Sequence, residues 1–302
     1  MNKLSITIKT FIFFAIILGA SALANAQATR TWVSGVGADD NPCSRTAPCK
    51  TFAGAISKTA TNGEINCLDP AGYGAVTITK SITIDCEDTQ GSILASLVNG
   101  VIINMAAADT KKAVRIRGIS INGAATGLTG VKVLGALNSL VLQEVVLDGF
   151  TLHGVSIETT SGSLKALIDH TTIRNNAGHA INSFPVGSTA NIEVTNSTLS
   201  NNTQNGLNLA DNNVASIVDT VVSSNGVGLL ASNAQIFATR CNIFKNTTGV
   251  QAQSGGTVRL FANTITGNGT GLTGSTITAV TGTNTVLGNT SEGAPTSFAP
   301  AL

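Results

Sequence analysis

A short pattern returns along the chain from Val114 to Gly293, and this repeat constrains the fold more than any other feature. Each unit has one apolar residue followed by another seven positions later, and successive units are offset by 21 to 26 residues. The pairs are Val114/Ile121, Leu140/Leu147, Ala166/Ile173, Ile192/Leu199, Ala215/Val222, Ile236/Ile243, Val258/Ile265 and Val280/Leu287. A small residue and an aliphatic one, as in Gly130-Val131, then begin a third segment.

Each unit therefore predicts three short strands and three bends. No unit can bury its apolar positions alone, whereas stacking on a neighbour completes both the backbone ladder and the core. Asparagine suits such bends because it tolerates left-handed backbone and bonds to nearby backbone groups. We expect an asparagine ladder at Asn176, Asn202, Asn225, Asn246 and Asn268. The sequence predicts an all-β solenoid of parallel strands over residues 64–290.

The first 26 residues have the features of a secretory signal peptide. Lys3 and Lys9 are followed by the apolar run Phe11–Leu18, and Ala24-Asn25-Ala26 is a small-residue cleavage site. The run is short for a bilayer span, which needs about 20 residues, and no later segment is long and apolar enough. We expect a secreted or periplasmic protein without a membrane span once residues 1–26 are removed.

The remaining chain has almost no net charge. Removing Lys3 and Lys9 from 17 basic residues leaves 15 against 16 acidic residues. Such a surface lacks the positive charge that attracts nucleic acid, so no nucleic-acid partner is expected. The sequence leaves the oligomeric state open.

The five cysteines all lie after the predicted signal peptide, where a secreted chain can oxidise them. Four of them can pair in three ways, and we predict the pairs Cys43–Cys49 and Cys67–Cys86 because each would close a short segment. Cys241 is left over, and we expect a small buried thiol rather than a nucleophile. Neither pair has the spacing of a zinc site.

The segment 27–63 is predicted to be an N-terminal cap with an amphipathic helix. The helix is expected over Thr46–Ala60, because Thr46 can cap it and Phe52, Ala55 and Ile56 share one face. A helix of this kind can cover the apolar end of a solenoid. Residues 291–302 are expected to be a C-terminal tail.

The chain resembles the right-handed parallel β-helix repeats of the pectate-lyase-like superfamily. The resemblance rests on the Asn-Ser/Thr-x-Ile/Leu coils, the Asn-rich bends and the Gly-aliphatic steps that follow them. The segment from Trp32 to Ile56, with Asn41-Pro42-Cys43 and Ala47-Pro48-Cys49, looks like the cap of bacterial secreted β-helix proteins. This architecture hosts lyases, hydrolases, epimerases and non-enzymatic proteins, so the resemblance implies the fold more strongly than an activity.

In polyuronate-cleaving relatives the resemblance implies acidic and basic residues on the outer face of one sheet, with calcium in the lyases. The matching outward positions here are Lys132, Ser156, Asn182, Asn208, Leu230, Gln251 and Thr273. They include no aspartate, and the only charged residues nearby are Lys132 and Glu158. We therefore expect no cofactor, and calcium would enter only if the protein were a lyase.

The strongest candidates for chemistry are His153 and His179, which occupy equivalent positions in consecutive coils. Asp148 and Arg174 lie on nearby bends, so the four residues could form a metal or acid–base site. The alternative is that they are exposed histidines and a surface ion pair.

Three hypotheses about function follow from these observations, and the weakest is a structural secreted domain with no ligand of its own. The first is a secreted, non-enzymatic β-helix that presents a polar surface for binding or adhesion to polysaccharide or cell-envelope material. The second is a polysaccharide lyase or glycoside hydrolase with an atypical active site at the two histidines.

Overall fold

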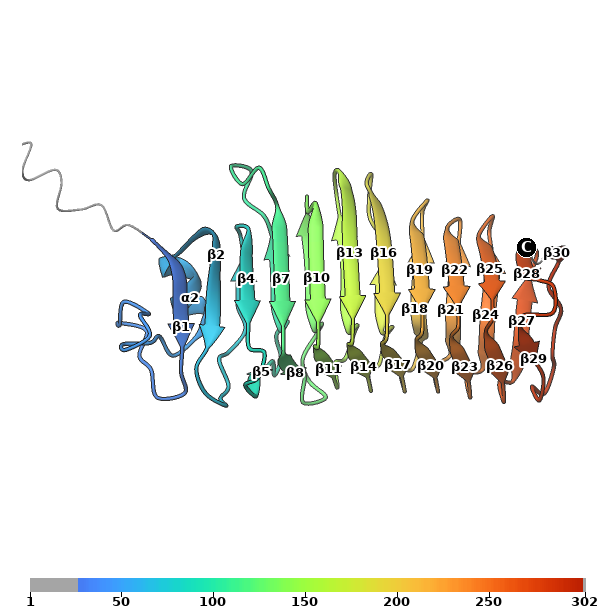
Figure 1. Ribbon diagram of the computed structural model, residues 1–302, viewed down its shortest axis with the longest axis horizontal. Coiled ribbons are helices and arrows are strands. Elements are labelled where there is room, and N and C mark those ends of the chain that lie inside the picture. The colour runs from blue at the N-terminus through green and yellow to red at the C-terminus, as the bar shows by residue number, and fades with distance from the viewer. Residues whose placement is uncertain (1–26, 301–302) are drawn as a thin grey trace, which may run out of the picture.

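Residues 27–300, as described by a computed structural model, form a solenoid of three parallel sheets that we call A, B and C (Figure 1). The sheets contain 12, 9 and 9 strands. Strands that are neighbours in a sheet are one coil apart in sequence, so each coil passes through sheets A, B and C in turn. The predicted fold class is confirmed, while the predicted signal peptide, residues 1–26, lies outside the described residues.

The strands of the three sheets have the following bounds. Sheet A contains β1 (Ala28–Val33), β2 (Thr59–Cys67), β4 (Ile82–Asp85), β7 (Ala113–Arg117), β10 (Ser139–Gln143), β13 (Ser163–Asp169), β16 (Thr189–Thr195), β19 (Val214–Val218), β22 (Gln235–Thr239), β25 (Thr257–Phe261), β28 (Ile277–Val280) and β30 (Ser297–Ala299). Sheet B contains β5 (Gly91–Leu94), β8 (Ile119–Asn122), β11 (Val146–Asp148), β14 (Thr172–Arg174), β17 (Thr198–Ser200), β20 (Val221–Ser223), β23 (Asn242–Phe244), β26 (Thr264–Thr266) and β29 (Thr285–Val286). Sheet C contains β3 (Val76–Ile78), β6 (Val101–Asn104), β9 (Val131–Gly135), β12 (Val155–Thr159), β15 (Ile181–Ser183), β18 (Asn205–Ala210), β21 (Val227–Ser232), β24 (Thr248–Gln253) and β27 (Thr270–Gly274).

The core fills the inside of the coils because alternate strand residues point inward. In β13, for example, Leu164, Ala166 and Ile168 are buried while Ser163 and Lys165 are exposed. Equivalent inward residues stack from coil to coil. The predicted register is therefore observed as Val114↔Leu140↔Ala166↔Ile192↔Ala215↔Ile236↔Val258.

The predicted register is wrong in the last coil. Val258 pairs with Ile277 and Ile265 pairs with Val286, instead of with Val280 and Leu287. The bend between β27 and β28 is shorter than in the preceding coil, and the bend between β28 and β29 is longer. Apolar spacing alone does not reveal these two changes of bend length, because aliphatic residues stand at both sets of positions.

The cap helix α2 (Phe52–Lys58) is shorter than the predicted Thr46–Ala60. The chain bends at residues 45–47 and is extended just before the helix, where the Cys49 N–H donates to the Trp32 carbonyl of β1 at 3.0 Å. Thr51 is the N-cap, and its side chain accepts from the Gly54 N–H. After Lys58 the chain enters β2, so Ala60, the predicted last residue of the helix, lies inside a strand. No helix within residues 27–300 has the length and hydropathy needed to cross a bilayer.

The two predicted disulfides are supported by the structure. The Cα atoms of Cys43 and Cys49 are 4.6 Å apart, and those of Cys67 and Cys86 are 4.8 Å apart. The first pair ties the extended segment before α2, and the second joins β2 to the end of β4. At the other end, the segment expected to be a tail carries β30, which pairs with β28.

Candidate functional site

The outer face of sheet C carries one row of side chains in register, which we call the sheet C row. Strand pairing places each member beside its counterpart in the next coil, as the sequence indicated. The row contains Lys132, Ser156, Asn182, Asn208, Leu230, Gln251 and Thr273. Amides and hydroxyls therefore repeat along the solenoid axis at about the spacing of parallel strands, 4.8 Å, with Leu230 as the one apolar member.

The side-chain amides at the centre of the row hydrogen-bond to one another, which fixes their orientation. The Asn208 side-chain amide donates to the Asn182 carbonyl oxygen at 2.8 Å, and Asn205 donates to the Asn208 carbonyl oxygen at 3.4 Å. Asn182 and Asn208 are both half-buried. Each keeps hydrogen-bonding capacity beyond these contacts, because an amide has two donor hydrogens and an acceptor oxygen with two lone pairs.

The charged end of the row is a closed network. Lys132 lies 3.3 Å from one carboxylate oxygen of Glu158, and the buried Ser156 hydroxyl donates to the other at 2.8 Å. Both oxygens of Glu158 are therefore engaged. Each oxygen of this carboxylate thus has one partner, and the pair contributes to the shape and polarity of the face.

His153 and His179 stack as the sequence predicted, with ring centroids 5.1 Å apart and planes 12° apart. The Nδ1 atom of His153 accepts from the His179 backbone N–H at 3.1 Å, and Nδ1 of His179 accepts from the Asn205 N–H at 3.0 Å. Each ring is thus a neutral imidazole with its proton on Nε2. Burial lowers the pKa of both histidines, that of His179 to about 4.

Asp148 and Arg174 form a separate pair on sheet B. Arg174 Nε donates to Asp148 Oδ2 at 3.0 Å, and the Asn175 amide donates to the other carboxylate oxygen at 2.9 Å. The charges that act on His153 are instead those of Glu158 and Lys132. The structure therefore brings the histidines together and the ion pair together, and it places the histidines beside the charged end of the sheet C row.

The positions of the two histidines give little support to a metal-binding site. Within residues 27–300, no group of three or more histidine, cysteine, aspartate or glutamate side chains is close enough to hold a metal ion. The two Nδ1 atoms already accept backbone hydrogen bonds. Only the Nε2 atoms remain, and each carries the proton.

The asparagine ladder is buried and structural. Asn176, Asn202, Asn225, Asn246 and Asn268 are each 1–4% exposed. In each step the side-chain oxygen of the next asparagine accepts from both the backbone N–H and the side-chain amide of the one before. Cys241 is a buried free thiol in the bend between sheets A and B, and burial raises its pKa to about 11. Neither the ladder nor Cys241 is accessible for chemistry.

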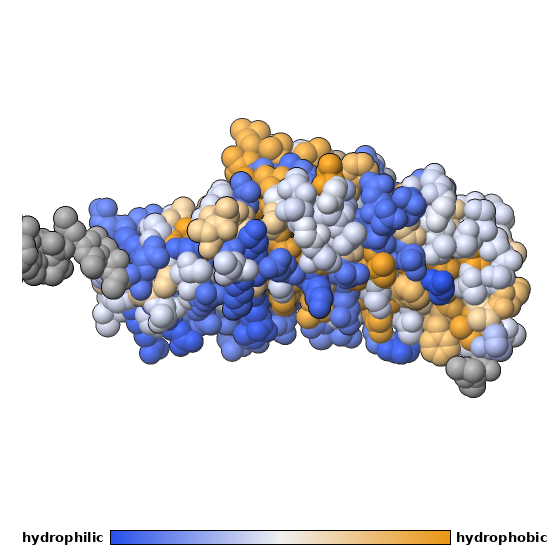
Figure 2. Space-filling model, turned by 90° about the horizontal axis from the view of Figure 1, so that it is seen from above, coloured by the Kyte–Doolittle hydropathy of each residue, from blue (hydrophilic) through white to orange (hydrophobic). Residues whose placement is uncertain are grey.

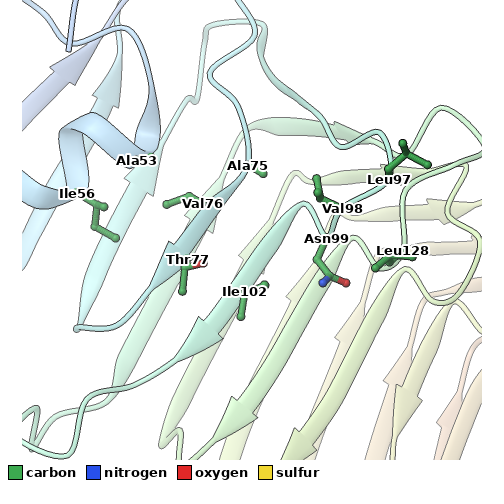
Figure 3. A pocket seen from close by; sticks show the side chains of 10 residues that line it. All are labelled: Ala53, Ile56, Ala75, Val76, Thr77, Leu97, Val98, Asn99, Ile102 and Leu128. Carbon is green, nitrogen blue, oxygen red and sulfur yellow. The ribbon is translucent and has the colours of Figure 1, made fainter.

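One feature of sheet C was not foreseen from the sequence. A cavity of about 560 Å³ lies at its N-terminal end, between α2 and the bends that precede β6 and β9. Figure 3 shows Ile56 of α2 on one side, Leu97, Val98 and Leu128 on the other, and Thr77 and Ile102 on the strands between them. We call this the N-terminal pocket. The signal for it was a leucine at each of two bends, Leu97 and Leu128.

Comparisons with known proteins agree with the observed topology. A family model described as "Right handed beta helix region" matches residues 184–294. The fold is similar to the crystal structure of pectate lyase Pel9A, with a TM-score of 0.52 and 16% identity over 86% of this chain and 70% of that chain. No curated protein sequence matches the chain.

Two other solved structures are similar at lower scores. The A-module of mannuronan C-5 epimerase AlgE4 from Azotobacter vinelandii has a TM-score of 0.45 and 11% identity, over 79% of this chain and 91% of that chain. A GH136 lacto-N-biosidase from Eubacterium ramulus has a TM-score of 0.45 and 8% identity, over 97% of this chain and 70% of that chain. The sheet topology, the family match over residues 184–294 and the likeness to Pel9A lead to one conclusion: the chain folds as a right-handed parallel β-helix, and this fold is similar to that of pectate lyase Pel9A.

Proposed function

We propose that the sheet C row binds a polysaccharide whose sugar units follow the solenoid axis. The observation that carries the proposal is the row itself, in which the half-buried side chains of Asn182, Asn208, Gln251 and Thr273 stand in register, interrupted once by Leu230. Sugars present hydroxyl groups that donate and accept hydrogen bonds, and hydroxyl and amide side chains match both functions. The fold is similar to that of a pectate lyase, which makes a polysaccharide a reasonable ligand class to test first.

The energetics favour a long ligand over a single sugar. One hydrogen bond exchanged with water contributes about 0.5–1.5 kcal/mol, so a single unit would bind weakly. Several units on one chain bind as linked modules, and their combined affinity rises far above that of each. The row is nearly uncharged apart from the paired Lys132 and Glu158. A neutral or weakly charged polymer therefore suits it better than a highly charged one.

Three features favour binding over cleavage. Glu158 has both carboxylate oxygens engaged, and the two histidines use Nδ1 to accept backbone hydrogen bonds. Burial lowers the pKa of both histidines, which disfavours the protonated ring that would donate a proton as a general acid. The two disulfides fit an oxidising compartment. We accordingly propose a secreted or periplasmic protein that binds glycan or adheres to it.

The proposal is tested by measuring binding to a panel of soluble polysaccharides by affinity electrophoresis. The variant Asn182→Ala/Asn208→Ala removes the two central amides, and the control Asn191→Ala/Asn242→Ala removes exposed asparagines from sheets A and B. Loss of two hydrogen bonds of about 1 kcal/mol each should weaken binding roughly tenfold or more. The control should bind like the unaltered protein.

Two outcomes would overturn this function. One is that Asn182→Ala/Asn208→Ala binds every polysaccharide as tightly as the unaltered protein does. The other is release of reducing ends or unsaturated products from any polymer, with or without calcium, because the protein would then be an enzyme. In that case His179→Ala would show whether the stacked histidines take part.

A further inference from the structure

The N-terminal pocket differs from the rest of sheet C in that its lining is apolar. Ile56, Val98, Ile102 and Leu128 contribute to its walls and floor, and none of its lining residues is ionisable. Leu97 and Val98 are 73% and 47% exposed. Figure 2 shows hydrophobic residues gathered over the N-terminal half of the molecule, where some project from one edge. Exposed apolar side chains around a concave surface commonly mark a binding site.

The pocket is continuous with the sheet C row. Its floor residues Thr77 and Ile102 pair with each other across β3 and β6, and Ile102 pairs in turn with Lys132, the first member of the row. The same outward column therefore changes from apolar at Ile102 to polar at Ser156 within two coils. A single ligand lying along this column would meet an apolar pocket at one end, then the paired Lys132, and then the amides of Asn182, Asn208 and Gln251.

We infer that the N-terminal pocket binds an apolar substituent, such as an acyl or alkyl chain, on the glycan that occupies the sheet C row. This inference rests on the proposed glycan-binding function of the row and specifies its ligand as an amphiphilic glycan. The cavity, about 560 Å³, is within the range of about 300–1,000 Å³ that is common for small-molecule sites. Its uncharged lining suits a neutral chain, and Lys132 next to it is neutralised by Glu158.

The pocket is concave, which distinguishes this occupant from a bilayer surface. A membrane-binding face usually combines protruding apolar residues with an excess of cationic side chains. Here the walls are formed by α2 on one side and the bends before β6 and β9 on the other (Figure 3). An isolated chain can enter between such walls, and burial of each methylene raises affinity about fourfold.

The test uses three probes that separate the sugar from the chain. Octyl β-glucoside, kept below its micelle concentration, has both parts, methyl β-glucoside has the sugar without the chain, and sodium octanoate has the chain without the sugar. Binding to the full protein is followed by titration calorimetry. Octyl β-glucoside should bind at least tenfold more tightly than either of the other two.

The variants are chosen so that the fold is preserved. Leu97→Asn places asparagine at a φ of 63°, which asparagine tolerates better than leucine. Ile102→Thr places a β-branched polar residue in a column where Thr77 already stands. The double variant should lose the preference for octyl β-glucoside. The control Leu152→Asn changes a comparable exposed bend residue outside the pocket and should keep the preference.

Several results would overturn the inference without affecting the proposed function. Equal binding of octyl and methyl β-glucoside would mean that the pocket takes no chain. Equally tight binding of sodium octanoate would mean that the sugar plays no part. Binding of phosphatidylcholine vesicles, or a dimer lost in the Leu97→Asn/Ile102→Thr variant, would assign the pocket to a membrane or to a second copy. Failure of the proposed function would appear separately, as unchanged polymer binding in Asn182→Ala/Asn208→Ala.

Discussion

At the scale of single residues, the stacked histidines are the candidates for chemistry whose hydrogen bonds the structure defines most closely. His179 stands where the next coil has Asn205, and its Nδ1 accepts the Asn205 backbone N–H. The spacing of His153 and His179 correctly predicted that they stack. It could not predict the acceptor role of Nδ1, because that depends on the direction of a backbone N–H in the neighbouring coil.

This role predicts a pH dependence of stability. The pKa of His179 falls from 6.5 to about 4 on folding, so the folded state favours the neutral ring. The contribution of His179 to stability is complete above about pH 6.5 and is lost progressively as the pH falls towards 4. The urea midpoint should therefore decline over this range. In His179→Asn, which can supply the same acceptor, the decline should be smaller; identical pH profiles for the two proteins would contradict the assignment.

Two buried serines differ in their partners and provide a matched pair. Ser183 is fully buried in sheet C, and its hydroxyl has no hydrogen-bond partner among the described residues. Ser197 is also buried, but its hydroxyl donates to the Thr195 carbonyl at 2.6 Å and accepts from the Thr171 N–H.

Alanine should therefore have opposite effects at the two positions. Ser183→Ala should raise the free energy of unfolding by about 1 kcal/mol, since an unpaired buried hydroxyl costs free energy, while Ser197→Ala should lower it by about 1–3 kcal/mol. Ala231 already occupies the Ser183 column, so the smaller side chain fits there. Denaturant unfolding of both variants measures the difference, and destabilisation of equal size would contradict the account.

At the scale of elements, the asparagine ladder joins successive coils through buried side-chain hydrogen bonds. Asn225 donates to Asn246 Oδ1 and to the Leu199 carbonyl, and its own oxygen accepts from the backbone and side-chain N–H groups of Asn202. A change at this position therefore affects partners in the coils on both sides.

Asn225→Ala should lower the free energy of unfolding by about 2–4 kcal/mol, because several buried donors and acceptors lose their partner. The exposed Asn191→Ala should change it by less than about 0.5 kcal/mol. Denaturant titrations of the two variants measure both values. Similar midpoints for the two variants would mean that the ladder contributes little to stability.

Prediction from sequence was most successful for elements where each coil repeats the last. The expected register is observed for the small-aliphatic pairs that begin the third strand of each coil, from Gly130-Val131 to Gly271-Leu272, and for the asparagine column. The start of α2 was missed because the backbone pairing of Cys49 with β1 is a contact between distant segments. Helical periodicity near Thr46 gave no sign that residues 45–47 form a bend and that Cys49 pairs with β1.

At the scale of the whole molecule, stacking of the coils produces both a buried core and an exposed face, each from a different set of columns. Inward and ladder positions make the core, while the outward column of sheet C makes a continuous face from Thr77 to Thr273. The polar part of this face was visible in the sequence as a row of hydroxyls and amides. The N-terminal pocket was not, since it forms only where α2 and two irregular bends meet.

The central claim is that the sheet C row contacts glycan, and side-chain amide NMR signals test it most directly. The NH₂ groups of Asn182, Asn208 and Gln251 lie on the row, whereas those of Asn191 and Asn242 lie on the other two sheets. On titration with the polysaccharide that binds best, we predict shifts of the three row signals and none for the two controls. Shifts at Asn191 or Asn242 with an unperturbed row would contradict the account.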